Sequence, residues 1–171
     1  MNPKIIGLCG PKGVGKSTYA RSFKGAVILS FATPIKEMLK VILPHPAWLE
    51  KKEEPIPGFP DGITVRRMLQ SLGTEWGRES IYPNIWVDAS MRKAEEHIGK
   101  RLIIFDDLRF ENEAWAIRRL GQSHEIITQI VHISRKSYKP DKNENHISEA
   151  GIPNSFIDKW VTVDDEGEAA E

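Results

Sequence analysis

The residues with the clearest chemical pattern run from Gly10 to Ser17, whose sequence GPKGVGKS fits G-x-x-x-x-G-K-S/T. Glycines at these positions let the backbone wrap around a phosphate with its N–H groups pointing inward. Lys16 can place a positive charge on the outer phosphates of a nucleotide, and the Ser17 hydroxyl can ligate Mg²⁺. The pattern therefore predicts nucleotide-phosphate binding. It leaves open whether the protein is a kinase, an ATPase or a switch.

A second chemical pattern is the apolar run Leu102–Phe105, which leads into Asp106 and Asp107. In nucleotide-binding folds such a strand delivers a carboxylate to the Mg²⁺. Hydrolytic proteins often place a glutamate directly after this aspartate, whereas here Leu108 and Arg109 follow. A monophosphate acceptor needs no strong base, because its second pKa is about 6 and it is already ionised at neutral pH. This feature favours a nucleotide kinase.

A third group of polar residues lies between these two motifs. Arg66 and Gln70 are four residues apart and would share one face of a helix, and Arg78 follows soon after. Arginine binds phosphate through two hydrogen bonds, and glutamine can both donate to and accept from a base edge. Solvated surface arginines are the alternative interpretation.

These motifs need a scaffold of alternating strands and helices. Apolar runs predict strands at 4–9, 26–31, 102–105, 126–133 and 160–163, and helical spacing predicts helices at 16–23, 33–42, 65–72, 85–98 and 111–120. Thr33 is placed as the N-cap of its helix with Pro34 at the first helical position, and Gly121 as a C-terminal cap. The expected fold is α/β, a doubly wound, parallel five-stranded sheet with helices on both faces and its ligand at the C-terminal ends of the strands.

The whole chain is expected to form a single domain, residues 1–171, with a proline-rich excursion at 44–62, a short lid at 135–146 and an acidic tail at 165–171. Of its residues, 40% are hydrophobic and 28% charged, and 24 basic residues balance 24 acidic ones. A net charge of zero argues against a nucleic acid polymer or a membrane as partner. Cys9 is the single cysteine, expected as a small buried hydrophobe.

The N-terminus lacks the layout of a signal peptide, and no apolar stretch approaches the roughly 20 residues that cross a bilayer. A cytoplasmic protein is therefore expected, in the host cytoplasm if a phage encodes it. Its partner is expected to be a small nucleotide, and a homodimer is left open.

Five segments, GPKGVGKST, SFATPIK, VRRMLQSLGTE, IIFDDLRFENEA and HISEAGIP, occur in this order at a characteristic spacing. Over Lys4 to about Asp164 the chain thereby resembles the deoxynucleoside monophosphate kinases of bacteriophages, which are adenylate-kinase-like P-loop kinases. The resemblance implies a transferase that uses ATP and Mg²⁺ to convert deoxynucleoside monophosphates to diphosphates.

The resemblance also implies roles for individual residues. The ATP-binding residues would be Gly10, Gly13, Val14, Gly15, Lys16, Ser17, Thr18 and, from the lid, Arg135, Lys139 and Lys142. The acceptor would be bound by Lys12, Ala32, Thr33, Pro34, Lys36, Arg66, Gln70, Thr74, Arg78, Trp86, Arg109 and Glu113, where Trp86 packs near the base or simply in the core. The catalytic residues would be Lys16, Asp107 and Arg109. Ser17 and Asp107 would hold the metal, because Asp107 matches the acidic position of the family better than Asp106. His146 is interpreted as structural or lid-anchoring.

Two other functions remain open at this stage. A P-loop kinase acting on dephospho-coenzyme A or a nucleoside would need a base for its hydroxyl acceptor, and an aspartate after the second strand would favour it. The sequence has Ser30-Phe31-Ala32-Thr33 there. A P-loop ATPase module would need a hydrolytic glutamate or a basic groove.

Overall fold

The structure, a computed structural model, describes residues 2, 4–60, 62–137 and 151–164. Within these residues five strands form one sheet in the order β2-β3-β1-β4-β5, with every neighbouring pair parallel. The strands are β1 (Ile5–Cys9), β2 (Val27–Leu29), β3 (Ile103–Phe105), β4 (Thr128–Arg135) and β5 (Lys159–Val163). The predicted parallel five-stranded α/β sheet is confirmed.

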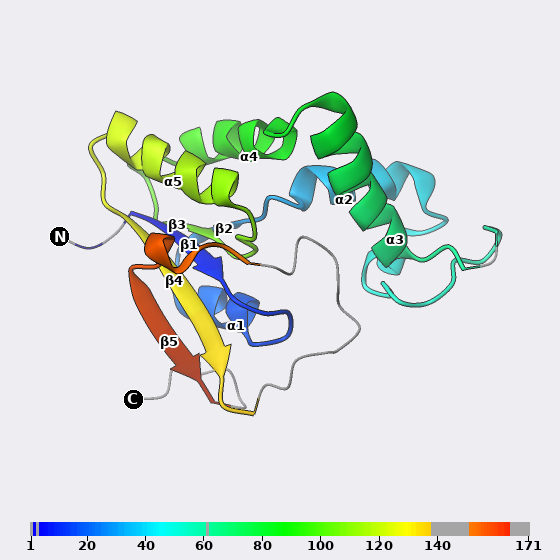
Figure 1. Cartoon of the computed structure of the whole chain (residues 1–171), viewed down its shortest axis with the longest axis horizontal. Helices are drawn as coiled ribbons and strands as arrows, with labels where there is room; N and C mark the ends of the chain where they lie inside the picture. The colour runs from blue at the N-terminus through cyan, green and yellow to red at the C-terminus, as the bar shows by residue number, and fades with distance from the viewer. Residues whose placement is uncertain (1, 3, 61, 138–150, 165–171) are drawn as a thin grey trace. The chain divides into compact units, whose positions relative to one another are not determined.

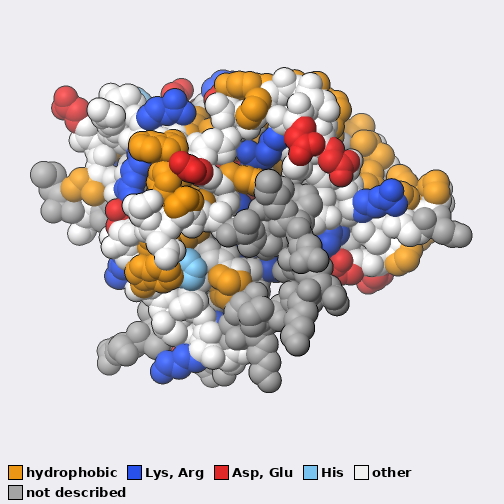
Figure 2. Space-filling view, in the orientation of Figure 1, with side chains coloured by type: hydrophobic (Ala, Val, Ile, Leu, Met, Phe, Trp, Pro, Cys, Tyr) orange, Lys and Arg blue, Asp and Glu red, His pale blue; other side chains and the backbone are white. Residues whose placement is uncertain are grey.

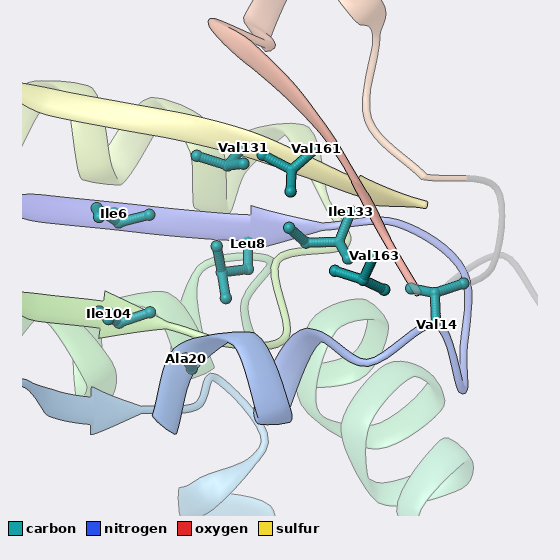
Figure 3. Packing of buried hydrophobic residues seen from close by; sticks show 9 residues of the cluster. All are labelled: Ile6, Leu8, Val14, Ala20, Ile104, Val131, Ile133, Val161 and Val163. Atoms are coloured by element: carbon teal, nitrogen blue, oxygen red, sulfur yellow. The ribbon is translucent and has the colours of Figure 1, made fainter. Parts of the chain in front are cut away.

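Two helices cover opposite faces of this sheet, α1 (Lys16–Ser22) and α5 (Glu111–Ser123) (Figure 1). Side chains alternate along β1, so that Ile6 and Leu8 pack with Ala20 of α1 in one buried cluster. This cluster, drawn in Figure 3, consists of Ile6, Leu8, Val14, Ala20, Ile104, Val131, Ile133, Val161 and Val163. Burial on both faces explains why the strands are short apolar runs.

The other face of the sheet lies close to α5. A Cβ on Gly7 would lie 2.8 Å from the Cδ1 atom of Ile117, so the strand has no room for a side chain there. Gly121 of α5 likewise lies against β4, because a Cβ on this glycine would lie 2.2 Å from Cγ2 of Thr128. The predicted role of Gly121 as a C-terminal cap is wrong. The helix continues to Ser123, and Gly121 allows its close approach to β4.

The chain divides into two compact units, one consisting of Met1–Phe31 and Met91–Glu171 and the other of Ala32–Ser90. The first unit contains the whole sheet, α1, α5 and the short 3-10 helix η4 (Asn154–Phe156). The second unit begins after β2, where the sequence analysis expects one continuous domain. Helix α4 (Ile85–Glu95) runs across the boundary and ends before the predicted residue 98.

The second unit contains α2 (Thr33–Ile42), the 3-10 helix η1 (Pro46–Leu49), α3 (Val65–Gln70) and the π-helix η2 (Ser71–Ile81). Helix α2 begins one residue earlier than predicted, with Ala32 rather than Thr33 at the N-cap. The proline-rich segment 44–62 is packed into this unit, because it contributes Leu49 and Ile56 to the same buried cluster as Leu39 of α2. These contacts hold the described part of the segment on the unit.

No helix in the described part of the chain is long and apolar enough to span a membrane. Basic and acidic side chains are interspersed with hydrophobic ones on the face shown in Figure 2.

Candidate active site

The glycine-rich loop joins β1 to α1 and is held in place by the sheet. Gly10 has φ 125°, and a Cβ there would lie 2.2 Å from the carbonyl oxygen of Ile133, so glycine is required on both counts. Val14 is fully buried and packs with Ile133 and Val163, which anchors the middle of the loop (Figure 3). Gly15 is the left-handed residue before α1, with φ 100°. The loop is therefore a preformed turn.

Lys16 lies across its own loop. Its Nζ atom donates hydrogen bonds to the carbonyl oxygens of Gly10 and Pro11, each at 2.6 Å. These two contacts fix the ammonium group beside the backbone that would surround a phosphate. Lys12 and Thr18 belong to the same segment and are exposed.

The residue after Lys16 meets the end of β3. The Ser17 hydroxyl donates a hydrogen bond of 2.9 Å to Oδ2 of Asp106. A hydroxyl and a carboxylate oxygen at this separation are the ligands that Mg²⁺ takes in nucleotide sites, where it usually keeps only one or two protein ligands and binds phosphates as well. The donor set therefore fits Mg²⁺.

Asp107 contacts the segment that follows β2. Its Oδ2 accepts a hydrogen bond of 2.5 Å from the Ser30 hydroxyl, and its Oδ1 accepts one of 2.8 Å from the backbone N–H of Phe31. The Phe31 ring also stacks on Phe105, with centroids 4.7 Å apart. Asp107 thus holds the segment that leaves β2.

The structure brings Asp106, and not Asp107, to the Ser17 hydroxyl. Successive side chains leaving a strand point in different directions, so two consecutive aspartates serve different neighbours. Asp106 reaches Ser17 on the β1 side, and Asp107 reaches Ser30 on the β2 side. Sequence reasoning did not predict the contact of Asp106 with Ser17 or that of Asp107 with Ser30, because no pattern in a three-residue strand shows which way each following carboxylate turns.

Arg109 and Glu113 are linked through the backbone. Oε2 of Glu113 accepts hydrogen bonds from the N–H groups of Arg109 at 2.8 Å and Phe110 at 3.0 Å. Glu113 is only 2% exposed and stands in the first turn of α5. The structure thus gives Glu113 a role in holding the loop that carries Arg109, where the sequence analysis expects a contact with the acceptor.

Lys16 also affects the pKa values of two groups on neighbouring strands, His132 and Cys9, which sequence reasoning did not select as site residues. Burial lowers the pKa of His132 below its usual value, and Lys16 adds a smaller effect in the same direction. Burial raises the pKa of the Cys9 thiol to about 11, against a smaller opposing effect of Lys16. The His132 ring lies 4.3 Å from that of Trp160.

The lid residues are described only in part. Arg135 ends β4, and its Nε atom is buried with no hydrogen-bond partner among the described residues. Lys139, Lys142 and His146 lie outside the described residues, as does the tail 165–171. Their predicted roles stay predictions.

The expected acceptor-binding residues that remain lie in the second unit. Ala32, Thr33, Pro34 and Lys36 form the start of α2, where the Lys36 N–H donates to the Ala32 carbonyl at 3.0 Å. Arg66, Gln70, Thr74 and Arg78 follow one another along α3 and η2, and all four are half-buried.

Arg66, Arg78 and Trp86 have defined partners within the unit, and Arg78 donates to the Pro83 carbonyl oxygen at 3.4 Å. Arg66 forms an ion pair with Glu53. Trp86 is 3% exposed, and its indole N–H donates to the carbonyl oxygen of Gly73 at 2.7 Å. Of the two roles open for Trp86, the structure supports packing in the core.

Comparisons with known proteins give a family. Residues 46–169 match the family model described as deoxynucleotide monophosphate kinase. The chain is 29% identical over 131 residues to the deoxynucleoside-5'-monophosphate kinase of Escherichia phage T5, an alignment that covers 75% of this chain and 49% of that protein. This chain therefore spans about half the length of its curated relative.

Two solved structures have limited similarity to this chain. The tunicamycin resistance protein of Deinococcus radiodurans has a TM-score of 0.42 at 15% identity, covering 92% of this chain and 85% of its own. An APS kinase mutant of Mycobacterium tuberculosis has a TM-score of 0.36 at 15% identity, covering 94% and 85%. Neither similarity is high enough to support a functional comparison. The match of the family model over most of the sequence is sufficient by itself: this chain belongs to the deoxynucleotide monophosphate kinase family.

Proposed function

We propose that this protein transfers the γ-phosphoryl group of ATP to the phosphate of a deoxynucleoside monophosphate, giving a deoxynucleoside diphosphate and ADP. The observation that carries the proposal is the arrangement of Lys16, Ser17 and Asp106 around a preformed loop, in a chain of this family. Phosphoryl transfer of this kind requires mainly positioning and neutralisation of charge, and both are within reach of these groups. A free nucleotide, rather than a nucleic acid polymer, is the proposed substrate, in keeping with the zero net charge.

On the ATP side, Lys16 exchanges its contacts with the Gly10 and Pro11 carbonyls for phosphate oxygens. Ser17 and Asp106 would hold Mg²⁺, which when bound supplies positive charge to the phosphoryl oxygens. The rest of the proposed ATP contacts come from Gly10, Gly13, Val14, Gly15 and Thr18 in the loop and from Arg135, Lys139 and Lys142 in the lid. The lid keeps water from the reacting phosphate, because ATP hydrolysis would otherwise compete with transfer.

On the acceptor side, the phosphate attacks as an already ionised nucleophile, so no side chain has to take its proton. Arg109 would stabilise charge on the transferring group from a loop that Glu113 holds through its backbone. In this proposal the acceptor is bound by Lys12, by the start of α2 and by four side chains of α3 and η2, Arg66, Gln70, Thr74 and Arg78.

The two alternative functions are less well supported. A hydroxyl acceptor needs a base. The carboxylate that reaches the segment after β2 is that of Asp107, which follows β3 and whose two oxygens accept hydrogen bonds from Ser30 and Phe31. A hydrolytic ATPase needs a glutamate beside the attacking water. Glu113 is buried and accepts two backbone N–H groups instead.

The test is product formation from ATP and Mg²⁺ with a panel of deoxynucleoside and ribonucleoside monophosphates, plus nucleosides as hydroxyl acceptors. We expect one or more deoxynucleotides to be converted, and Lys16→Ala to lower kcat about 10²- to 10³-fold. Lys24→Ala, at an exposed position just after α1, is the matched control and should keep full activity. Conversion of nucleosides but of no monophosphate would overturn the proposal.

A further inference from the structure

The segment after α3 has an unusual backbone. Ser71–Ile81 is a π-helix of 11 residues that continues α3 without a break. The Tyr82 N–H donates to the carbonyl oxygen of Gly77 at 2.9 Å, five residues earlier, and the Ser80 hydroxyl reaches the carbonyl oxygen of Glu75 at 2.7 Å. Most π-helical segments are single turns, and they occur frequently at functional sites.

The π turn changes which side chains share a face. In an α-helix, residues four apart are offset by about 40°, so three such steps spread four residues over about a third of the circumference. A π turn closes its hydrogen bond at the fifth residue, so residues four apart fall slightly short of a full turn. The angle around the helix axis that separates Arg66 from Gln70 in α3 is therefore compensated by steps of the opposite sign in η2.

This reversal aligns Arg66, Gln70, Thr74 and Arg78, which we call the acceptor row. Burial along the helix agrees with one continuous row, because all four residues are half-buried. Gly73 and Gly77 on one side of it are buried, and Glu75 and Glu79 on the other are exposed. A regular α-helix would instead carry Arg78 away from Arg66 around the helix.

Trp86 packs against the helix on the glycine side. Its indole N–H donates to the Gly73 carbonyl at 2.7 Å, a carbonyl that an α-helix would use for the Gly77 N–H. A Cβ on Gly77 would lie 2.5 Å from Cζ2 of Trp86, so the ring occupies the space above that glycine. The indole N–H of Trp86, which occupies the Gly73 carbonyl, and the indole ring, which packs against Gly77, both favour a π turn over an α turn.

We propose that Trp86 is a positioning residue that holds Ser71–Ile81 in the π register and so aligns the acceptor row for the incoming nucleotide. The row carries two guanidinium groups with an amide and a hydroxyl between them. This chemistry suits a nucleoside monophosphate, because arginine binds its phosphate and the amide can bind a base edge or sugar hydroxyl. The proposal rests on the proposed function for the identity of the ligand.

The main test compares Trp86→Phe with Trp115→Phe. The first variant keeps an aromatic ring and removes the N–H that reaches Gly73, whereas the control removes an exposed indole whose N–H reaches the Glu111 side chain at 3.3 Å. We expect Trp86→Phe to raise the KM for the deoxynucleotide about 5- to 10-fold, since a buried carbonyl loses its donor. The KM for ATP should stay within about 2-fold, and Trp115→Phe should match the wild type. A folded Trp86→Phe variant with an unchanged deoxynucleotide KM, or with both KM values raised equally, would overturn the proposal.

A second pair of measurements keeps the proposal testable if that variant does not fold or if the wild type converts no monophosphate. Ser80→Ala removes an exposed hydroxyl that is bonded to the Glu75 carbonyl and should leave the protein folded. Hydrogen exchange of its amides should become faster within 71–82 and stay unchanged in the sheet. Unchanged exchange in 71–82 would refute the π-register argument. Absence of monophosphate conversion by the wild type would instead refute the proposed function.

Discussion

The two consecutive aspartates after β3 give the sharpest prediction, because the structure assigns them different partners. We expect Asp106→Ala to abolish most activity, and Asp107→Ala to lower stability about twice as much as Asp106→Ala does. Asp106 accepts a hydrogen bond from the Ser17 hydroxyl. Asp107 accepts hydrogen bonds from the Ser30 hydroxyl and the Phe31 N–H.

The magnitudes follow from these contacts. A hydrogen bond to a charged group contributes about 1.5–3 kcal/mol, and both groups are half-exposed, so the lower end applies to each. Loss of the two Asp107 bonds should cost about 3 kcal/mol, which corresponds to a fall in Tm of about 6–12 °C for a chain of this size. Loss of the bond from Ser17 to Asp106 should cost about 1.5 kcal/mol, which corresponds to a fall in Tm of about 3–6 °C. For Asp106→Ala we therefore expect about half the fall in Tm of Asp107→Ala but a loss in kcat of about 10²- to 10³-fold.

The assay is a kinase measurement at saturating ATP over a range of Mg²⁺ concentrations, combined with thermal unfolding of each variant. Asp88→Ala, at a half-exposed position in α4, is the control for loss of a carboxylate and should change neither quantity. The reasoning is refuted if Asp107→Ala keeps the wild-type Tm but loses its response to Mg²⁺ while Asp106→Ala stays active. That result would restore Asp107 as the metal ligand.

Two further predictions concern Glu113 and His132. Glu113→Gln keeps an oxygen acceptor for the Arg109 N–H and should therefore retain a higher kcat than Glu113→Ala. The two variants should bind ATP equally. An equal kcat in both variants would exclude the positioning role of Glu113. Burial, with a smaller effect of Lys16, lowers the pKa of His132 below its usual 6.5, so the unfolded chain binds the proton more tightly than the folded one. Stability should therefore fall as the pH drops below about 6.5, and urea midpoints at pH 7.5 and 5.5 should differ less in His132→Gln than in the wild type.

The parts of the fold that the sequence predicted are those set by local patterns. Apolar runs of strand length, a glycine-rich turn and helical spacing identified the strands and their alternation with helices, because each pattern is complete within a few residues. Gly121 shows where this reasoning fails. A glycine near a predicted helix end indicates a cap, but here its reason is a contact with Thr128 on β4, which no local pattern contains.

In the candidate site, too, the sequence predicted the features that local patterns determine and missed those that depend on distant contacts. The loop from Gly10 to Ser17 could be assigned because its spacing determines its conformation. The π register of Ser71–Ile81 could not, because residues four apart also fit an α-helix. The signal in retrospect is a pair of glycines, Gly73 and Gly77, four residues apart and followed by Trp86, which needs space on the helix surface. Recognising it requires knowing that the tryptophan packs there.

The strand order explains why two adjacent acids at this position are useful. β3 lies between β1 and β2, so residues leaving its C-terminal end are next to the segments that follow both strands. One carboxylate can then reach the hydroxyl after the phosphate-binding loop while the next holds Ser30 and Phe31, the last residues of the first unit before Ala32 begins the second. Asp106→Ala therefore tests the contact with the phosphate-binding loop, and Asp107→Ala tests the exit of the chain from β2. The double variant should depart from the sum of the two single effects on Tm, because neighbouring residues couple by about 0.5–3 kcal/mol, and the double-mutant cycle measures that coupling.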